Sequence, residues 1–424
     1  MANFLSEKQL KILAFAESKY DALICDGSIR SGKSSIMSVA FVMWAMKHFD
    51  GKNFGICSKT TGTADRNVIR PLVSMAFMQE RYQMKYSTMK KLTVSDGKHT
   101  NTFYIFGGRD ASSYQLIQGI TLAGVLLDEV ALMPRSFVDQ ALARCSVTGR
   151  KLWFNCNPET HLHWFNQEWI LEAEKHNALH LHFTLDDNPS LDPKIKADYE
   201  NMYTGVFYDR YIKGLWVAAE GVIYAETFTD ENKLTPEQVS ALTFEDEYKV
   251  SCDFGIQNAT VFLLWRKILG QKKYVCIQEW YYSGREQKHQ KTVIELVDGL
   301  TEMLNGREVK YVIVDPSASA LKVELRRQGY KVRDAQNEVI NGISHTSKLL
   351  QENLLLFSTA CKNTIDEFSL YAWDEKAADG GYDVPVKEND HCMDAMRYFV
   401  NTEHLYTKLY KNDELSGFGR LSLM

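Results

Sequence analysis

Residues 27–34 read Gly27-Ser28-Ile29-Arg30-Ser31-Gly32-Lys33-Ser34 and fit the phosphate-binding pattern G-x-x-x-x-G-K-[ST]. The apolar run before them (22–25) predicts a buried strand, and residues 35–46 after them predict a helix. Glycines let the backbone N–H groups turn toward phosphate oxygens at a positively polarised helix N-terminus. In such a loop Lys33 neutralises phosphate charge and Ser34 binds Mg²⁺. The stretch therefore predicts a site for a nucleoside triphosphate.

Length and composition indicate a globular chain that is too long for one ordinary core. Its 424 residues predict two domains. The net charge is −5, so any contact with DNA has to come from local basic patches. The eight cysteines show no CxxC pair and no zinc-ligand spacing, which indicates a reduced intracellular protein. We expect no membrane partner, because the sequence shows no signal peptide and no apolar run of about 20 residues.

The segments around the loop leave some interpretations open. A helix predicted over residues 5–18 carries Gln9, whose amide suits either the edge of an adenine base or plain solvation. A second strand is expected over 53–58, followed by a helix over 65–78. On that helix Arg66 and Arg70 lie one turn apart and suit contacts with DNA or with a neighbouring subunit's phosphates, whereas either arginine alone is more typical of a solvated face. Two strands around Asp96-Gly97 predict a hairpin.

An apolar strand over 123–127 ends in two acids and predicts the metal-binding strand of the same nucleotide site. Asp128 is placed to hold Mg²⁺ beside Ser34, and Glu129 to polarise the attacking water. The next strand (151–158) ends in polar residues, where Asn157 is placed to sense the γ-phosphate. Arg30 and Arg109 are both candidates for the cation that stabilises the transition state, and the sequence does not choose between them.

Four histidines (161, 163, 180 and 182) invite a metal interpretation, which we set aside. His180 and His182 lie on one face of a short strand, and no cysteine or acid has ligand spacing to them. A helical stretch then runs from about 187 to 213. Polar and glycine-containing sequence over 214–245 predicts the joint between the two domains.

The second half predicts strands over 250–255, 260–265, 274–279 and 311–316, and helices over 290–304 and near 390–398. Asp253 and Asp315 each end a strand, and Asp394 shares a helix face with His391. Carboxylates from separate elements can converge on two divalent ions, one activating water and the other stabilising the leaving 3′-oxygen. Oxygen ligands suit Mg²⁺ or Mn²⁺ rather than zinc. Glu279, at another strand end, is a weaker candidate.

This order of motifs resembles the large terminase subunit of tailed bacteriophages, in its SPP1/PBSX-like branch. The resemblance covers nearly the whole chain and is carried by GSIRSGKSS, VLLDE, FNCNP, the joint at 214–224, and residues 252–255, 313–315 and 390–398. It implies an α/β protein in which a P-loop (ASCE/RecA-like) ATPase domain is followed by an RNase H-like endonuclease domain. The implied divisions are 1–213 for the ATPase, 214–245 for the joint and 246–424 for the nuclease.

The resemblance also implies what each candidate does. ATP hydrolysis would be carried by Lys33, Ser34, Asp128 and Glu129 with ATP and Mg²⁺, and coupled to DNA movement by Asn157. DNA cleavage would be carried, with Mg²⁺ or Mn²⁺, by Asp253, Asp315, Asp394 and His391. The implied partners are double-stranded DNA, the portal protein of the procapsid, a small terminase subunit and further copies of the chain in a ring. The implied place is the host cell cytoplasm, with transient docking on the procapsid.

Two other functions fit parts of the pattern. A helicase–nuclease of DNA repair would need further helicase motifs, and none is seen between residue 158 and the joint. A nucleotide-switched assembly protein with an inactive nuclease-like domain would have no need to gather three aspartates at mutual electrostatic cost. The function that the resemblance implies is therefore the one we expect: ATP-driven packaging of a viral genome, with cutting of concatemeric DNA at initiation and termination.

Overall fold

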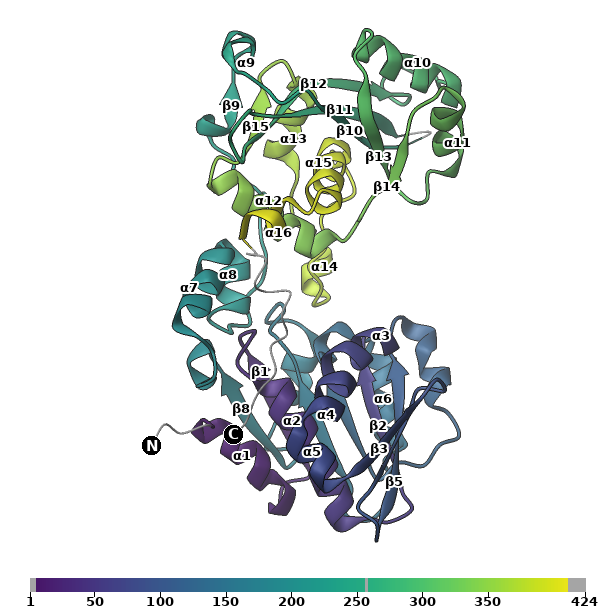
Figure 1. Cartoon of the computed structure of the whole chain (residues 1–424), viewed down its shortest axis with the longest axis vertical. Helices are drawn as coiled ribbons and strands as arrows, with labels where there is room; N and C mark the ends of the chain where they lie inside the picture. The colour runs from purple at the N-terminus through teal and green to yellow at the C-terminus, as the bar shows by residue number, and fades with distance from the viewer. Residues whose placement is uncertain (1–4, 256–257, 411–424) are drawn as a thin grey trace.

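The computed structural model describes residues 5–255 and 258–410 of the chain. Within these two ranges the strands form an eight-stranded sheet in the first half of the chain and a seven-stranded sheet in the second. Figure 1 shows the two sheets in separate halves, with α7 and α8 lying between them. Residues 1–4, 256–257 and 411–424, which the predicted domains include, lie outside the described residues.

The first sheet has the strand order β3-β4-β5-β2-β6-β7-β1-β8. The strands from β5 to β8 in that order are parallel, and β3 and β4 extend the sheet as an antiparallel hairpin. Consequently β7 lies between β1 and β6. The strands are β1 (Ala22–Gly27), β2 (Asn53–Ser58), β3 (Gln83–Ser87), β4 (Lys91–Ser95), β5 (Thr100–Gly107), β6 (Gly124–Asp128), β7 (Lys151–Asn155) and β8 (Ala178–Phe183).

An aromatic core fixes the long helix α2 (Lys33–His48) on this sheet. Phe41 and Trp44 of α2 pack against Trp153 of β7 and Phe54 of β2, with ring centroids 5.7 to 6.0 Å apart. All four rings are at most 2% exposed. Packed aromatic rings contribute more than the burial of their area alone. The helix is therefore held with its N-terminus at the carboxyl ends of the parallel strands.

The first-half helices correct two sequence predictions. The helix predicted over 65–78 is a π-helical turn (Asp65–Ile69) followed by two helices that break at Met75. The helix predicted from 187 to 213 starts at Pro193 and breaks at Tyr203, whose backbone is extended. Apolar spacing continues across both breaks, which is why the pattern did not reveal them. The helices are α1 (Glu7–Ala14), α2, α3 (Thr61–Ala64), α4 (Arg70–Ser74), α5 (Ala76–Arg81), α6 (Arg135–Ala143), α7 (Pro193–Met202) and α8 (Gly205–Tyr211).

The second sheet has the strand order β14-β13-β10-β11-β12-β15-β9. Its third strand, β10, runs antiparallel to β11 and parallel to β13, so β10 and β13 have their carboxyl ends at one edge. The strands are β9 (Lys233–Leu234), β10 (Tyr248–Asp253), β11 (Ala259–Lys267), β12 (Tyr274–Ser283), β13 (Val309–Val314), β14 (Val332–Asp334) and β15 (Leu355–Ser358). β9 and the helix after it fall inside the predicted joint, so part of that joint packs with the second sheet.

Helices cover both faces of the second sheet because residues along β11 alternate between them. Phe262 and Leu264 pack with α10 and α11, whereas Leu263 and Trp265 pack with the other face. There Trp265 stacks on Phe399 of α15, with ring centroids 4.4 Å apart. The helices are α9 (Pro236–Ala241), α10 (Val293–Leu304), α11 (Ser319–Arg327), α12 (Val339–Gln351), α13 (Lys362–Leu370), α14 (Glu375–Asp379), α15 (His391–Thr402) and α16 (Leu405–Tyr410).

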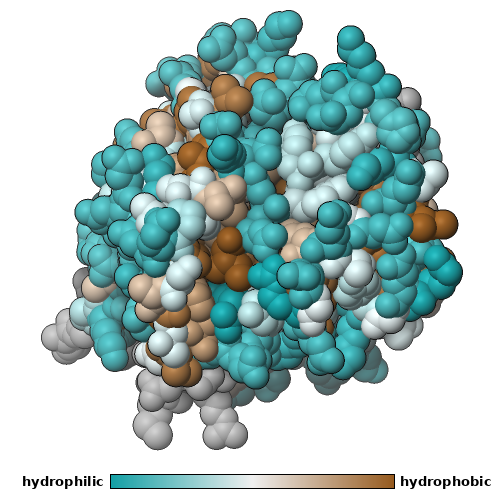
Figure 2. Space-filling view, turned by 90° about the horizontal axis from the view of Figure 1, so that it is seen from above, coloured by the Kyte–Doolittle hydropathy of each residue, from teal (hydrophilic) through white to brown (hydrophobic). Residues whose placement is uncertain are grey.

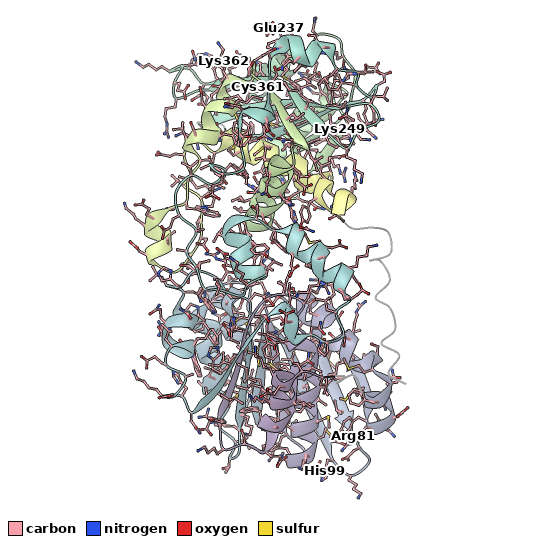
Figure 3. All side chains as sticks on the ribbon, turned by 90° about the vertical axis from the view of Figure 1, so that its left-hand side faces the viewer. Arg81, His99, Glu237, Lys249, Cys361 and Lys362 are labelled. Carbon is pink, nitrogen blue, oxygen red and sulfur yellow. The ribbon has the colours of Figure 1, made fainter. Side chains whose placement is uncertain are left out.

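The face of the molecule at the end of the second half is mainly polar (Figure 2). Seen from the end of the second half, it is mostly hydrophilic, and hydrophobic residues occupy several separate areas (Figure 2). Among the described residues, no helix is both long and apolar enough to span a bilayer. Figure 3 labels Arg81 and His99 at the far end of the first half, and Lys249 and Cys361 in the second.

A buried arginine connects the two halves. Arg210 of α8 is 1% exposed, and its guanidinium pairs with Asp383 and lies 3.6 Å from Glu159. Its Nε donates to the carbonyl of Val217 at 2.8 Å. Burial raises the pKa of Glu159 to about 7, against the opposing charge of Arg210. The guanidinium of Arg210 thus interacts with one carboxylate from the first half, Glu159, and with one from the second half, Asp383.

We predict that Arg210→Met lowers the free energy of unfolding by about 3–5 kcal/mol, because it leaves buried carboxylates without a cation. Chemical denaturation followed by circular dichroism measures this. The control is Arg327→Met, which removes an arginine that is 63% exposed and pairs with Glu324 on the same helix; its unfolding midpoint should not change. Unfolding of Arg210→Met at the wild-type midpoint would contradict the prediction.

Two candidate active sites

The phosphate-binding loop joins β1 to α2 and is anchored by its neighbours. Ser28 N donates to the carbonyl of Phe183, the last residue of β8, at 2.8 Å. Gly27 has φ +118°, and a Cβ atom there would lie 1.9 Å from the same carbonyl oxygen. Gly32 has φ +82° and caps the N-terminus of α2. Both positions require glycine, because this region of φ strains other residues.

The Lys33 ammonium lies inside the loop. It donates to the carbonyls of Gly27 and Ser28, at 3.1 and 2.6 Å, and to Asn157 Oδ1 at 3.3 Å. Lys33 is 5% exposed, and burial lowers its pKa to about 8. The structure thus brings together two predicted residues, Lys33 and Asn157, where phosphate oxygens would accept hydrogen bonds from the same ammonium.

Asn155 is a site residue that the sequence analysis missed. Its Nδ2 donates to Ser34 Oγ and to Asp128 Oδ1, both at 2.6 Å. Asn155 lies opposite Asp128 in the register of β6 and β7. Its Oδ1 is buried and has no hydrogen-bond partner in the part of the chain that the structure describes. Asn155 therefore joins the two residues predicted to hold Mg²⁺.

The two acids that follow β6 are both desolvated. Asp128 is 2% exposed, and burial raises its pKa. Glu129 has φ +61°, and burial together with the charge of Asp128 raises its pKa to about 7. Glu129, Asn157 and Glu159 line a cavity of about 220 Å³, together with Asn341 of α12. This cavity therefore lies where the second half meets the nucleotide site.

The structure also places the less certain candidates. Gln9 is 3% exposed, so the interpretation as a solvated residue is wrong; its Nε2 donates to the carbonyl of Ser31 in the loop at 3.5 Å. Arg30 Nε donates to the Tyr199 hydroxyl at 2.7 Å, and the Arg30 guanidinium lies over the Tyr199 ring. These contacts direct the Arg30 side chain toward α7. Arg109 is exposed.

His180 and His182 have an acidic partner that spacing did not reveal. Both donate hydrogen bonds to Asp26 Oδ1, at 2.8 and 3.1 Å, and Trp216 donates to Asp26 Oδ2 at 2.8 Å. Burial raises the pKa of Asp26, but the hydrogen bonds and charges of His180 and His182 hold it well below its usual range. This network ties the start of the loop to β8 and to the predicted joint.

The second candidate site lies at the edge where β10 and β13 end, beneath α15. His391 Nδ1 lies 2.9 Å from Asp253 Oδ2. Asp394 Oδ1 accepts from the Arg397 guanidinium at 2.6 Å, and Asp315 Oδ2 accepts from the Tyr398 hydroxyl at 3.2 Å. Side chains of α15 thus contact both strand-end aspartates, and the four predicted residues belong to one region.

The acids of this region repel one another. Burial raises the pKa of Asp253, and the charge of Asp394 adds to it, against the hydrogen bond from His391. Asp390, which the sequence analysis did not select, has its pKa raised by burial and by Asp394. In residues 5–255 and 258–410 no three acids, histidines or cysteines form a closed metal-binding group. The chemistry of these oxygen donors and their repulsion fit Mg²⁺ or Mn²⁺.

Glu279 has a different role from the one considered for it. Its two oxygens accept four hydrogen bonds of 2.7 to 2.9 Å from the backbone and side chains of Asn363 and Thr364. These bonds fill the lone-pair sites of the carboxylate. Glu279 therefore caps the N-terminus of α13 and keeps no free site for a metal ion.

We predict that Asn155→Ala raises the Mg²⁺ concentration needed for half-maximal ATP turnover by about 10- to 100-fold, because Ser34 and Asp128 lose their common partner. Phosphate release across a Mg²⁺ titration measures this. The control is Asn101→Ala, which removes a 1% exposed asparagine of the same sheet that bonds to the carbonyl of Phe49. An unchanged Mg²⁺ requirement in Asn155→Ala would remove the proposed role of the amide.

A family model described as terminase large subunit, T4likevirus-type, N-terminal, matches residues 24–228. No curated protein sequence matches the chain. The solved large terminase of a thermophilic bacteriophage is 48% identical, covers 94% of this chain and 98% of its own, and has a TM-score of 0.86. The structure of its ADP complex is 47% identical, covers 94% of this chain and 99% of its own, and has a TM-score of 0.85. The structure of its ATP-gamma-S complex is 46% identical, covers 94% of this chain and 98% of its own, and has a TM-score of 0.83. The SPP1/PBSX-like branch stays a prediction, but the chain belongs to the large terminase subunits of bacteriophages.

Proposed function

We propose that this large terminase subunit is an ATP-driven translocase of double-stranded DNA joined to a metal-dependent endonuclease. The observation that carries the proposal is the presence of two separate charged sites, one at the carboxyl edge of each sheet. The first gathers Lys33, Ser34, Asp128 and Asn155, and the second gathers Asp253, Asp315, Asp394 and His391. The similar large terminase of the thermophilic bacteriophage was solved with ADP and with ATP-gamma-S, which supports ATP as the ligand of the first site.

In the first site the residues bind phosphate and orient water. Lys33 donates to phosphate oxygens, and Ser34 and Asp128 hold Mg²⁺ while Asn155 keeps them aligned. The bound ion neutralises charge on the phosphate oxygens. Glu129, with a pKa of about 7, accepts the proton of the attacking water near neutral pH.

The contact between the halves provides a route from hydrolysis to movement. Asn157 contacts Lys33, and two residues later Glu159 faces Arg210, which also pairs with Asp383 of the second half. A change at the γ-phosphate therefore reaches the second half through buried charges. Movement of DNA by backbone contacts would be independent of its sequence.

In the second site the aspartates hold divalent ions for cleavage. Asp253, Asp315 and Asp394 supply the oxygen ligands, and His391 orients Asp253. Divalent ions held there would supply the activation of water and the stabilisation of the leaving 3′-oxygen. Arg397 and Tyr398 hold Asp394 and Asp315 in place. The substrate is concatemeric DNA, which is cut at the initiation and at the termination of packaging.

The wider setting of this activity is also part of the proposal. The partners are the portal protein of the procapsid, a small terminase subunit and further copies of this chain in a ring, in the host cell cytoplasm. We keep the division into an ATPase domain (1–213), a joint (214–245) and a nuclease domain (246–424). The end of β8 at Phe183 and the start of β9 at Lys233 support two units.

We predict that the wild type cuts plasmid DNA with Mn²⁺ or Mg²⁺ without sequence preference. Asp315→Ala should lower cutting by at least about 100-fold, because it removes a metal ligand. Lys33→Ala should still cut but should lose ATP hydrolysis, because its site is separate. Agarose gels and phosphate release measure the two activities. Asp334→Ala, which removes an aspartate that is 60% exposed and pairs with Lys322, is the control and should cut normally.

One result would reverse the assignment of the second half. If wild type and Asp315→Ala are equally inert toward DNA while ATP hydrolysis persists, the nuclease loses its support. A motor without a nuclease, or a nucleotide-switched assembly protein, would then explain the chain better.

A further inference from the structure

The helix that carries the nuclease candidates is capped by a residue from another helix. α15 begins at His391, and its N-cap residue, Asp390, makes no side-chain capping hydrogen bond. Instead Glu367 of α13 accepts from Cys392 N and Met393 N through its Oε2, at 2.7 and 3.3 Å. Glu367 is 5% exposed, and α13 packs beside α15 (Figure 1). The two capped N–H groups lie between His391 and Asp394 in the chain.

Glu279 holds α13 in the same way that Glu367 holds α15. Its four hydrogen bonds end on Asn363 and Thr364, in the first turn of α13. Hydrogen bonds from N–H groups to a carboxylate are stronger than neutral ones, and a negative charge is stabilised at a helix N-terminus. Two carboxylates in series therefore connect β12 to α13 and α13 to α15.

If Glu367 served only to pack α13 against α15, its carboxylate would destabilise the folded state. Its Oε1 is buried and has no hydrogen-bond partner in the described residues. A buried polar atom without a partner opposes folding, and an apolar side chain of similar size would avoid that cost. What an apolar side chain would not provide is an acceptor for the first turn of α15.

We propose that Glu367 is a positioning residue of the nuclease centre, an inference that rests on the proposed nuclease function. It fixes the first turn of α15, which carries His391, in contact with Asp253, and Asp394, in contact with Arg397. A rotation or shift of that turn displaces His391 and Asp394 together. Glu279 acts one step further back, through α13.

The test compares Glu367→Leu, which removes the acceptor at similar volume, with Glu367→Gln, which keeps an amide oxygen as acceptor. In Glu367→Leu we expect plasmid cutting to fall about tenfold and Mn²⁺ affinity, measured by titration calorimetry, to weaken about tenfold. Glu367→Gln should stay close to wild type in both. ATP hydrolysis and the thermal midpoint of each variant show whether the rest of the chain is intact.

The matched control is Glu324→Leu, which removes another buried carboxylate of the second half. Glu324 lies on α11 and bonds to Arg327 and Gln328 of its own segment, so cutting and Mn²⁺ affinity should not change. Glu279→Leu should weaken both in the same direction as Glu367→Leu. If Glu367→Leu does not fold, Glu367→Asp replaces it in the test. Its side chain is one methylene group shorter, which moves the acceptor away from α15, so DNA cutting and Mn²⁺ affinity should both fall.

Two results would overturn the proposal. One is a folded Glu367→Leu protein with wild-type cutting and wild-type Mn²⁺ affinity. The other is an equal loss in Glu367→Gln and Glu367→Leu, because the charge and not the acceptor would then matter. A wild type that cuts no DNA would contradict the proposed function. The role of Glu367 in positioning α15 would still be tested by the Mn²⁺ affinity of the variants.

Discussion

The nucleotide-facing edge of the first sheet depends on the amide group of Asn155. β7 lies between β1 and β6, so the residue at its carboxyl end is forced between the loop and the acidic strand. One NH₂ group bridges Ser34 and Asp128 at 2.6 Å each. The aromatic packing of α2 on the sheet keeps Ser34 within reach of that amide. The arrangement of the proposed Mg²⁺ site is therefore a consequence of strand order and of the one polar side chain, Asn155, that lies between Ser34 and Asp128.

The second half brings three aspartates to one region, and burial together with the charge of Asp394 raises the pKa of Asp253 there. It places two of them at adjacent strand ends and the third on α15. The Arg397 guanidinium, which is 2% exposed, offsets the charge of Asp394, and His391 donates to Asp253. Helix capping by Glu367 then determines where α15 begins. Between the halves, the guanidinium of Arg210 pairs with Asp383 and lies 3.6 Å from Glu159, so that buried charges connect the first half to the second.

Local spacing in the sequence was sufficient to locate the phosphate-binding loop at 27–34, the acidic pair Asp128 and Glu129, and the aspartates that end β10 and follow β13. The same patterns predicted β10, β11, β12 and β13 of the second sheet but not β9, β14 or β15, and the fold class came from the family resemblance. Asn155 was missed because its importance comes from the lateral order of strands, which neighbouring residues do not encode. For the same reason the sequence could not show that Asp26 accepts from His180 and His182. Glu279 was considered as a ligand because a strand-end acid looks the same whether it binds a metal ion or caps a helix.

The account's central claim is that two separate metal-dependent sites lie on one chain. The most direct measurement is diffraction from crystals grown with Mn²⁺ and a non-hydrolysable ATP analogue, using the anomalous signal of manganese. We predict one peak beside Ser34 and Asp128, and at least one more among Asp253, Asp315 and Asp394. Manganese at the nucleotide alone, with no peak at the three aspartates at saturating Mn²⁺, would contradict the account.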